Sequence, residues 1–169
     1  MPLIALLLAM AQASTTASPP PAPQQVDCND ANHTAFDFWI GEWDVSATGS
    51  AKVIARSHIE KIVGCAISET FVQTIGPQGR PLDYRGRSIS SFVPADGKWR
   101  QFYVDSGGTV ATLDGGIVDG AMVFETRRGG GINRMTLKAN ADGSVRQFGE
   151  RSADGTTWTA GYDFTYRRR

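Results

Sequence analysis

Turn-forming residues divide most of this 169-residue chain into short runs, and their spacing is the feature that most limits its fold. Asp-Gly, Gly-Gly and Gly-Pro steps recur roughly every 8 to 12 residues, and glycine supplies the positive φ angles that tight hairpins require. These turn segments are residues 76–77, 95–97, 106–108, 114–116, 128–131, 141–144 and 153–155. Between them apolar and polar residues alternate, as expected for strands with one buried face.

The alternating runs predict strands at residues 42–48, 52–62, 65–74, 85–93, 98–105, 109–113, 117–126, 132–139, 144–151 and 157–167. The connections between them are too short for crossover helices, so neighbouring strands should be antiparallel. A meander of about ten strands loses its exposed edges when it closes on itself. The sequence therefore predicts an all-β, antiparallel, up-and-down barrel.

A dense apolar segment precedes and enters the first expected strand. Residues 36–45 contain two tryptophans and two phenylalanines around Gly41, which indicates an anchor for the core. Upstream, Asn29 or Asp30 can cap a short helix over residues 31–38. We expect this helix to plug or flank one end of the barrel, with Gly41 marking its exit into strand.

Gly41 and Trp43, at the start of the first expected strand, resemble the opening Gly-x-Trp signature of the lipocalin/calycin barrels. The likeness to one group, exported bacterial calycin-like proteins of unknown function, extends over residues 36–43, 64–69, 98–105 and 152–155, with Trp158. The resemblance implies a barrel of the calycin type and a basic residue of the last strand stacked on Trp43. Arg167 is the candidate, and such a cation–π contact contributes about 0.5–2 kcal/mol. The resemblance implies no established activity.

The first 27 residues have the composition of an export signal and a tether. Residues 3–10 are apolar and are followed by Ala11-Gln12-Ala13, which predicts a signal peptide over residues 1–13. The apolar run is shorter than the roughly 20 residues that a membrane span needs, so we expect no membrane insertion. Residues 14–27 are rich in proline and predict a disordered linker before a barrel domain at 28–169. The expected location is periplasmic or secreted.

The two cysteines of the chain, Cys28 and Cys65, become interpretable if the protein is exported. Two lone cysteines in an oxidising compartment most simply pair with each other. A catalytic thiol or a metal ligand is the alternative, but no Cys-x-x-Cys motif or nearby histidine supports it. We expect a disulfide that pins the N-terminal segment across the barrel.

The charge balance bears on possible partners. Seventeen basic and seventeen acidic residues give no net charge, so a nucleic-acid partner is not expected. The only basic run is residues 167–169, which at a chain end is usually solvated. Within a barrel of this size the interior either fills with side chains or holds one small ligand. A small molecule is therefore the expected partner.

Polar residues on inward strand faces are the candidate ligand-binding groups. In residues 98–105, one face carries Trp99, Gln101 and Tyr103, and the other carries Phe102 and Val104. Either face can point inward. We favour the first, because two aromatic rings flanking an amide offer stacking surface with a donor and an acceptor.

Glu69 lies in a row with Cys65, Ile67 and Phe71, where a carboxylate is costly unless it is paired or protonated. Candidate partners are Arg87, Arg134 and Arg146. A buried pair would be a structural clamp, an anchor for a polar ligand group, or part of an acid–base site. Arg134 and Gln147 also alternate with apolar neighbours and are further candidates for the lining, with solvated side chains as the alternative.

No cofactor or metal site is expected from the two histidines. His58 and Glu60 share a strand face without an evident third ligand, which favours an exposed pair. His33 falls in the expected helix as a cap or surface residue. Haem is disfavoured because neither histidine lies in the later strands.

Three functional hypotheses follow from these residues. The first is a lipocalin-like protein that binds a small, partly apolar molecule in its barrel. The second is a small enzyme of the isomerase or cyclase type in which Glu69 supplies acid–base catalysis. The third is a fully packed structural module of the cell envelope. No nucleophile elbow or phosphate-binding loop points to other chemistry, and catalytic residues are not assigned.

Overall fold

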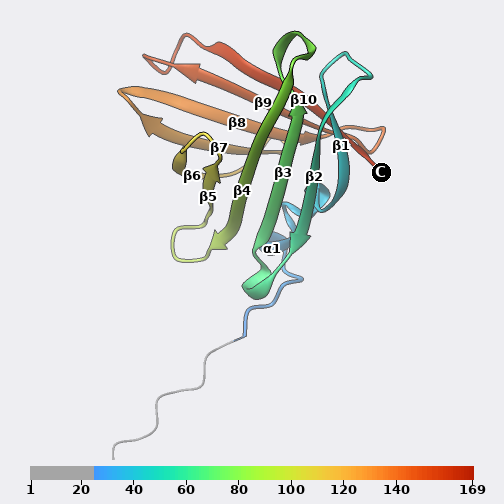
Figure 1. Ribbon diagram of the computed structural model, residues 1–169. Coiled ribbons are helices and arrows are strands. Elements are labelled where there is room, and N and C mark those ends of the chain that lie inside the picture. Colours follow the sequence, from blue (N-terminus) through green and yellow to red (C-terminus); the bar gives the residue numbers. More distant parts are fainter. Residues whose placement is uncertain (1–24) are drawn as a thin grey trace, which may run out of the picture.

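The computed structural model describes residues 25–169; the predicted signal peptide and most of the predicted linker lie outside this range. The described residues form a closed antiparallel barrel in which every strand pairs with its neighbours in sequence and β10 pairs with β1 (Figure 1). The strands are β1 (Gly41–Ala47), β2 (Val53–Lys61), β3 (Ile67–Ile75), β4 (Pro81–Val93), β5 (Lys98–Asp105), β6 (Val110–Val118), β7 (Ala121–Arg128), β8 (Gly131–Ala139), β9 (Val145–Ser152) and β10 (Thr159–Arg168). The predicted all-β, antiparallel, up-and-down barrel is confirmed.

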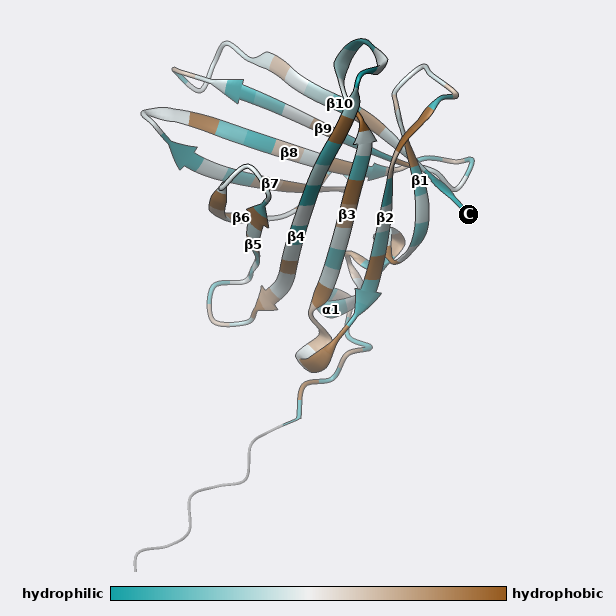
Figure 2. Ribbon diagram, viewed as in Figure 1, coloured by the Kyte–Doolittle hydropathy of each residue, from teal (hydrophilic) through white to brown (hydrophobic). Residues whose placement is uncertain are grey.

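Burial alternates along the strands, as the sequence pattern requires. Figure 2 shows hydrophobic and hydrophilic positions alternating along β3 and β4. The inward positions form one core around the fully buried Trp43, Val45, Phe124 and Tyr166. Strand alternation therefore decides which residues can reach the barrel interior.

The N-terminal segment closes one end of the barrel. Asp30 caps α1 (Ala31–Thr34) by accepting hydrogen bonds from the backbone N–H groups of Asn32 and His33, both at 2.9 Å. A 3-10 turn, η1 (Asp37–Trp39), follows, so the expected helix over residues 31–38 is two short pieces. No helix within residues 25–169 is long and apolar enough to span a membrane.

Two aromatic residues fix this segment, which we call the plug (residues 30–40), in the barrel end. Phe36 and Trp39 are fully buried and stack on each other with ring centroids 5.0 Å apart. Phe36 also packs edge-on against Trp99 of β5 and Phe124 of β7, at 5.6 and 5.8 Å. The expectation that the segment plugs or flanks one barrel end is confirmed.

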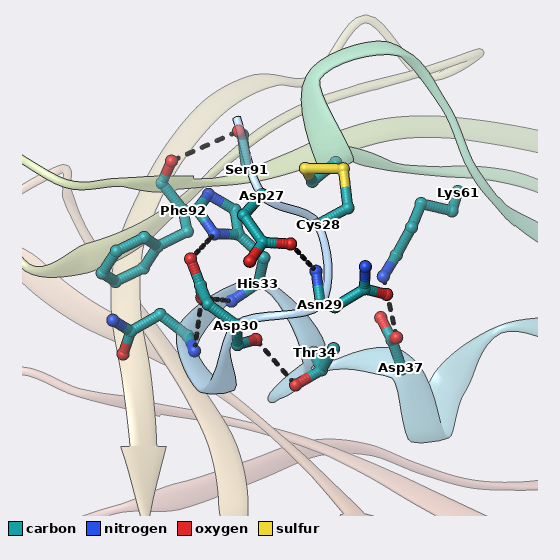
Figure 3. Close-up of a disulfide and its surroundings, with 12 residues drawn as sticks. Asp27, Cys28, Asn29, Asp30, His33, Thr34, Asp37, Lys61, Ser91 and Phe92 are labelled. Atoms are coloured by element: carbon teal, nitrogen blue, oxygen red, sulfur yellow. Dashed lines mark hydrogen bonds and ion pairs between the residues drawn. A yellow bond between two sulfur atoms is a disulfide. The ribbon is translucent and has the colours of Figure 1, made fainter. Parts of the chain in front are cut away.

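The disulfide joins the N-terminal segment to the barrel wall (Figure 3). Cys28 pairs with Cys65, whose Cα atom lies 5.2 Å away in η2 (Val63–Cys65), the turn between β2 and β3. Lys61 donates a hydrogen bond to Asp37 over 2.7 Å, so an ion pair adds a second link from the plug to β2. The predicted pairing of the two cysteines is confirmed.

His33 differs from its prediction as a cap or surface residue. Its side chain is buried, bonds Asp30 over 2.7 Å and lies edge-on against Phe92, with ring centroids 5.3 Å apart (Figure 3). This contact is how α1 packs onto β4. The prediction for His58 is confirmed: its ring is exposed and lies beside the carboxylates of Glu42 and Glu60.

One predicted turn is wrong. Residues 114–116 were expected to separate two strands, but they lie inside β6 and pair with residues 123–125 of β7. The chain turns instead at Asp119 and Gly120, whose φ angles of 49° and 74° suit a two-residue hairpin loop. Two Asp-Gly steps lie close together here, and the sequence favoured the first.

The residue that stacks on Trp43 is Arg168, not the predicted Arg167. The Arg168 guanidinium carbon lies 4.5 Å from the Trp43 ring centroid, and the two residues are direct cross-strand partners. Tyr166 points inward, so Arg167 must point to the opposite face, where its guanidinium donates to the hydroxyl of Ser46. The prediction was wrong by one residue because it did not use the alternation on either side of Tyr166.

Candidate functional site

The barrel encloses a cavity of about 570 Å³ between the plug and the opposite end. Ligand sites in proteins usually measure about 300–1,000 Å³. Six aromatic side chains contribute to the lining: Phe71, Tyr84, Tyr103, Tyr162, Phe164 and Tyr166. At its opening, the polar residues that β7, β8 and β9 contribute at their ends farthest from the plug are Thr126, Arg128, Asn133 and Arg151. We call these four residues the rim.

Glu69 of β3 is the buried acid of the cavity. Its carboxylate accepts hydrogen bonds from the hydroxyls of Ser57 at 2.8 Å and Ser88 at 3.4 Å. Ser57 comes from β2 and Ser88 from β4, so hydroxyls on both neighbouring strands hold the group. Burial raises the pKa of Glu69 to about 7, although neighbouring hydroxyls, first those of Ser57 and Ser88 and then that of Tyr166, oppose this shift by stabilising the charged form.

The expected arginine partner of Glu69 is absent among the described residues. Arg87 is paired in register with Thr70 and lies on the outer face, whereas Ser88 is the cross-strand neighbour of Glu69. Arg146 is also on the outside, where its guanidinium binds Asp163 through two hydrogen bonds. Two neutral hydroxyls therefore take the place of a cation, and this leaves Glu69 able to hold a proton near neutral pH.

Gln101 and Gln147 place two amides in the cavity lining. The Gln101 amide donates to the hydroxyl of Ser90 at 3.0 Å, and its carbonyl oxygen has no hydrogen-bond partner within residues 25–169. The Gln147 carbonyl accepts a hydrogen bond from the Tyr166 hydroxyl at 2.7 Å, and its amide lies 3.0 Å from the sulfur of Met135. Gln101 is thus the amide with spare capacity for a ligand.

Tyr103 belongs to a chain of hydroxyl groups. Tyr84 donates to the carboxylate of Asp105 at 2.9 Å and bonds the Tyr103 hydroxyl. Burial, reinforced by the hydrogen bond from Tyr103 to Tyr84, raises the pKa of Tyr103 far above its ordinary value. The pKa of Tyr84 is raised as well, so both phenols stay neutral where they line the cavity.

Residues 98–105 turn the favoured face inward. Trp99 and Gln101 are almost fully buried, while Phe102 on the other face is half exposed. Trp99, however, is not part of the cavity lining, because the plug residue Phe36 covers its ring. The alternation along residues 98–105 identified the inward face. It did not reveal that the plug reaches far enough into the barrel to cover Trp99.

Arg134 borders the cavity, but its charge is directed elsewhere. It alternates with the inward Asn133 and Met135, and its guanidinium binds Glu125 at 2.8 Å and Glu150 at 3.3 Å. The ring of Trp158 covers the same guanidinium at 3.7 Å. Arg134 is therefore the centre of an ion-pair cluster on the outer face of β7, β8 and β9.

Several lining residues were missed by the sequence analysis. Tyr84 and Tyr162 lie in runs where one face could not be told from the other, and Ser57 and Ser88 carry no signal except their place opposite Glu69. Phe124, Thr126 and Arg128 occupy alternate positions along β7. This alternation in the sequence indicates that Arg128 points inward at the rim. No group of three or more potential metal ligands occurs within the described residues.

Gly149 lets one of the cavity's tyrosine rings lie flat against the barrel wall. A Cβ atom at Gly149 would lie 2.2 Å from the Tyr162 ring, which is far too close. The register between β9 and β10 shifts next to this pair, and it brings Tyr162 opposite Gly149. The glycine therefore sets the depth of the cavity at this wall.

Replacing Gly149 by alanine should push the Tyr162 ring off the wall and destabilise the barrel by about 1–3 kcal/mol. Urea unfolding followed by tryptophan fluorescence measures this loss. The matched control is Gly161→Ala, where the new Cβ meets its nearest atom at an ordinary 3.5 Å. Equal stability of the two variants would contradict the assigned contact.

Comparison with known proteins adds no family to this description. No protein-family model matches the chain, and no curated protein matches it significantly in sequence. The function must therefore be inferred from the barrel and its cavity.

Proposed function

We propose that this protein binds a small, partly apolar molecule inside its barrel, as a lipocalin-like carrier does. The single observation that carries the proposal is the cavity of about 570 Å³, whose lining includes six aromatic rings and, away from the opening, the polar Glu69, Gln101 and Gln147. Apolar walls with a small number of placed polar groups are the usual composition of small-molecule sites. A fully packed structural module would have no such space, so the third hypothesis loses its support.

The polar groups favour a ligand with a hydrogen-bonding substituent at its buried end. The free carbonyl of Gln101 accepts a hydrogen bond, and Glu69 donates or accepts according to its protonation state. A hydroxyl group, which both donates and accepts, suits these two residues. The aromatic rings then surround the apolar body of the molecule.

Titration with N-phenyl-1-naphthylamine, a neutral dye that fluoresces in apolar sites, tests the proposal. The wild-type protein should bind it in the cavity, and Ala111→Trp should weaken binding at least tenfold by filling the space, because Ala111 lines the cavity. Thr112→Trp places the same new side chain on the exposed face of the same strand and should leave binding unchanged. Binding that is equal in both variants would place the dye elsewhere and contradict a cavity ligand.

Native mass spectrometry of the protein from its own host extends the test to the natural ligand. We expect a retained small molecule on the wild type and none on Ala111→Trp. The disulfide and the predicted export signal support a periplasmic or secreted location, since disulfides persist in oxidising compartments.

Acid–base catalysis remains a second candidate because Glu69 is a buried carboxyl with a pKa near neutrality inside the cavity. Glu69→Gln separates the two functions. A carrier would retain the same molecule in the variant as in the wild type. An enzyme would instead accumulate its substrate, so the mass or structure of the retained molecule would change.

A further inference from the structure

Two arginines at the rim carry charge that no described residue neutralises. Arg128 ends β7 and Arg151 lies near the end of β9, and both line the cavity opening. Neither takes part in an ion pair or a side-chain hydrogen bond within residues 25–169. Both are exposed, so water solvates them when no ligand is bound.

Strand register brings the two side chains to the same side of the opening. Thr126, Asn133 and Arg151 are cross-strand partners on β7, β8 and β9, and Arg128 is the next inward position along β7. The backbones of β7 and β9 are two strand spacings, about 10 Å, apart. Two long guanidinium side chains can close this gap on a single group from either side.

The other charged groups near the opening are already engaged. Arg134 is held by Glu125 and Glu150. Asp105, across the opening, accepts hydrogen bonds from Tyr84 and from the backbone N–H groups of Gly107 and Thr109. Neutral donors leave the charge of Asp105 in place but occupy its oxygens, so among the described residues the rim groups still open to a ligand are the guanidiniums of Arg128 and Arg151.

We infer that the ligand is an organic anion with a flat ring system, bound with its anionic group at Arg128 and Arg151 and its rings among the tyrosines of the cavity. Guanidinium groups match carboxylate, sulfonate and phosphate oxygens in geometry and charge. Tyr84, Tyr103 and Tyr162 contribute to the lining, and a flat body gains from contact with aromatic rings. This inference rests on the proposed function and adds the class of molecule and its orientation.

The opposite orientation is unfavourable for electrostatic reasons. The inner part of the cavity contains the Glu69 carboxyl and holds no cation among the described lining residues. An anionic group placed there would lose its hydration and, once Glu69 ionises, would meet a like charge. The anionic group therefore stays at the rim, and the neutral end of the molecule enters.

Two dyes with the same ring system separate this inference from the proposed function. 8-Anilinonaphthalene-1-sulfonate carries a sulfonate that N-phenyl-1-naphthylamine lacks, so the ratio of their dissociation constants reports the contribution of the anion. We expect the sulfonate to bind the wild type about tenfold more tightly, which corresponds to two partly exposed charge pairs. Arg128→Gln together with Arg151→Gln should abolish this preference, so that the ratio of the two dissociation constants approaches one.

Arg127→Gln is the matched control, because Arg127 neighbours Arg128 in the same hairpin but points to the outer face. It should preserve the preference for the sulfonate. Equal affinity of the wild type for both dyes, or a preference that survives the double variant, would overturn the anion inference while the carrier proposal stands. Failure of the neutral dye to respond to Ala111→Trp would instead count against the carrier itself.

Discussion

Replacing Glu69 by glutamine should change the free energy of unfolding in a pH-dependent way. The change should be about 3 kcal/mol more stabilising at pH 8 than at pH 4. The folded protein holds the Glu69 proton up to about pH 7, whereas an unfolded chain releases it near pH 4.5. Between these values the unfolded state loses protons that the native state keeps, so wild-type stability falls as pH rises. Glutamine does not titrate, and its amide can still bond Ser57 and Ser88.

Urea unfolding of both proteins at intervals from pH 4 to pH 8 measures this difference. The two stability curves should diverge mainly between pH 4.5 and pH 7 and run in parallel above that range. Glu60→Gln, which removes an exposed carboxylate on β2, is the control and should show no divergence of this size. Parallel curves for wild type and Glu69→Gln over the whole range would show that Glu69 ionises as it does in water.

Removing the disulfide by replacing Cys28 and Cys65 with alanine should lower the free energy of unfolding by about 4 kcal/mol. The bond joins residues separated by 37 positions, and a link of that length restricts the unfolded chain strongly. The native contacts of the plug, including the buried Phe36 and Trp39, remain in the variant. The loss should therefore appear as a lower urea midpoint rather than as a different fold.

Reduction of the wild type provides an independent check on this value. Oxidised protein, reduced protein and the double alanine variant should be compared by urea unfolding, and the last two should agree. A loss of less than 1 kcal/mol would mean that the unfolded chain already keeps the two cysteines close together. Near-ultraviolet circular dichroism, to which the buried Trp39 and Trp43 contribute, reports whether the plug keeps its native packing.

The barrel could be predicted because two-residue alternation and turn chemistry are local properties of the chain. All ten strands were found near their places, and the errors concern which of two neighbouring signals the fold uses. At residues 114–120 two Asp-Gly steps compete, and only the pairing of β6 with β7 decides between them. At the C-terminus Arg167 and Arg168 compete, and the inward position of Tyr166 decides.

The cavity was harder to predict because it depends on which residues meet across strands. Glu69, Gln101, Tyr103 and Gln147 were identified from polar residues in apolar rows, and all four line the cavity. The prediction that Arg87 pairs with Glu69 is wrong, because the strand register puts Ser88 opposite Glu69. A single sequence does not reveal this register. A shift of one residue exchanges inside for outside in a strand, so the same pattern that finds the right strand can give the wrong face.

Within residues 25–169 the plug fills one end of the barrel, and the cavity opens at the other end, at the rim. A molecule that enters past Arg128 and Arg151 should leave by the same route, because the packed rings of Phe36 and Trp39 block the opposite end. The hairpin loops around the rim should then control how long a molecule stays bound. Changes that rigidify the opposite end, where the disulfide holds the plug, should not slow exchange. Efforts to alter uptake or release should act on those loops.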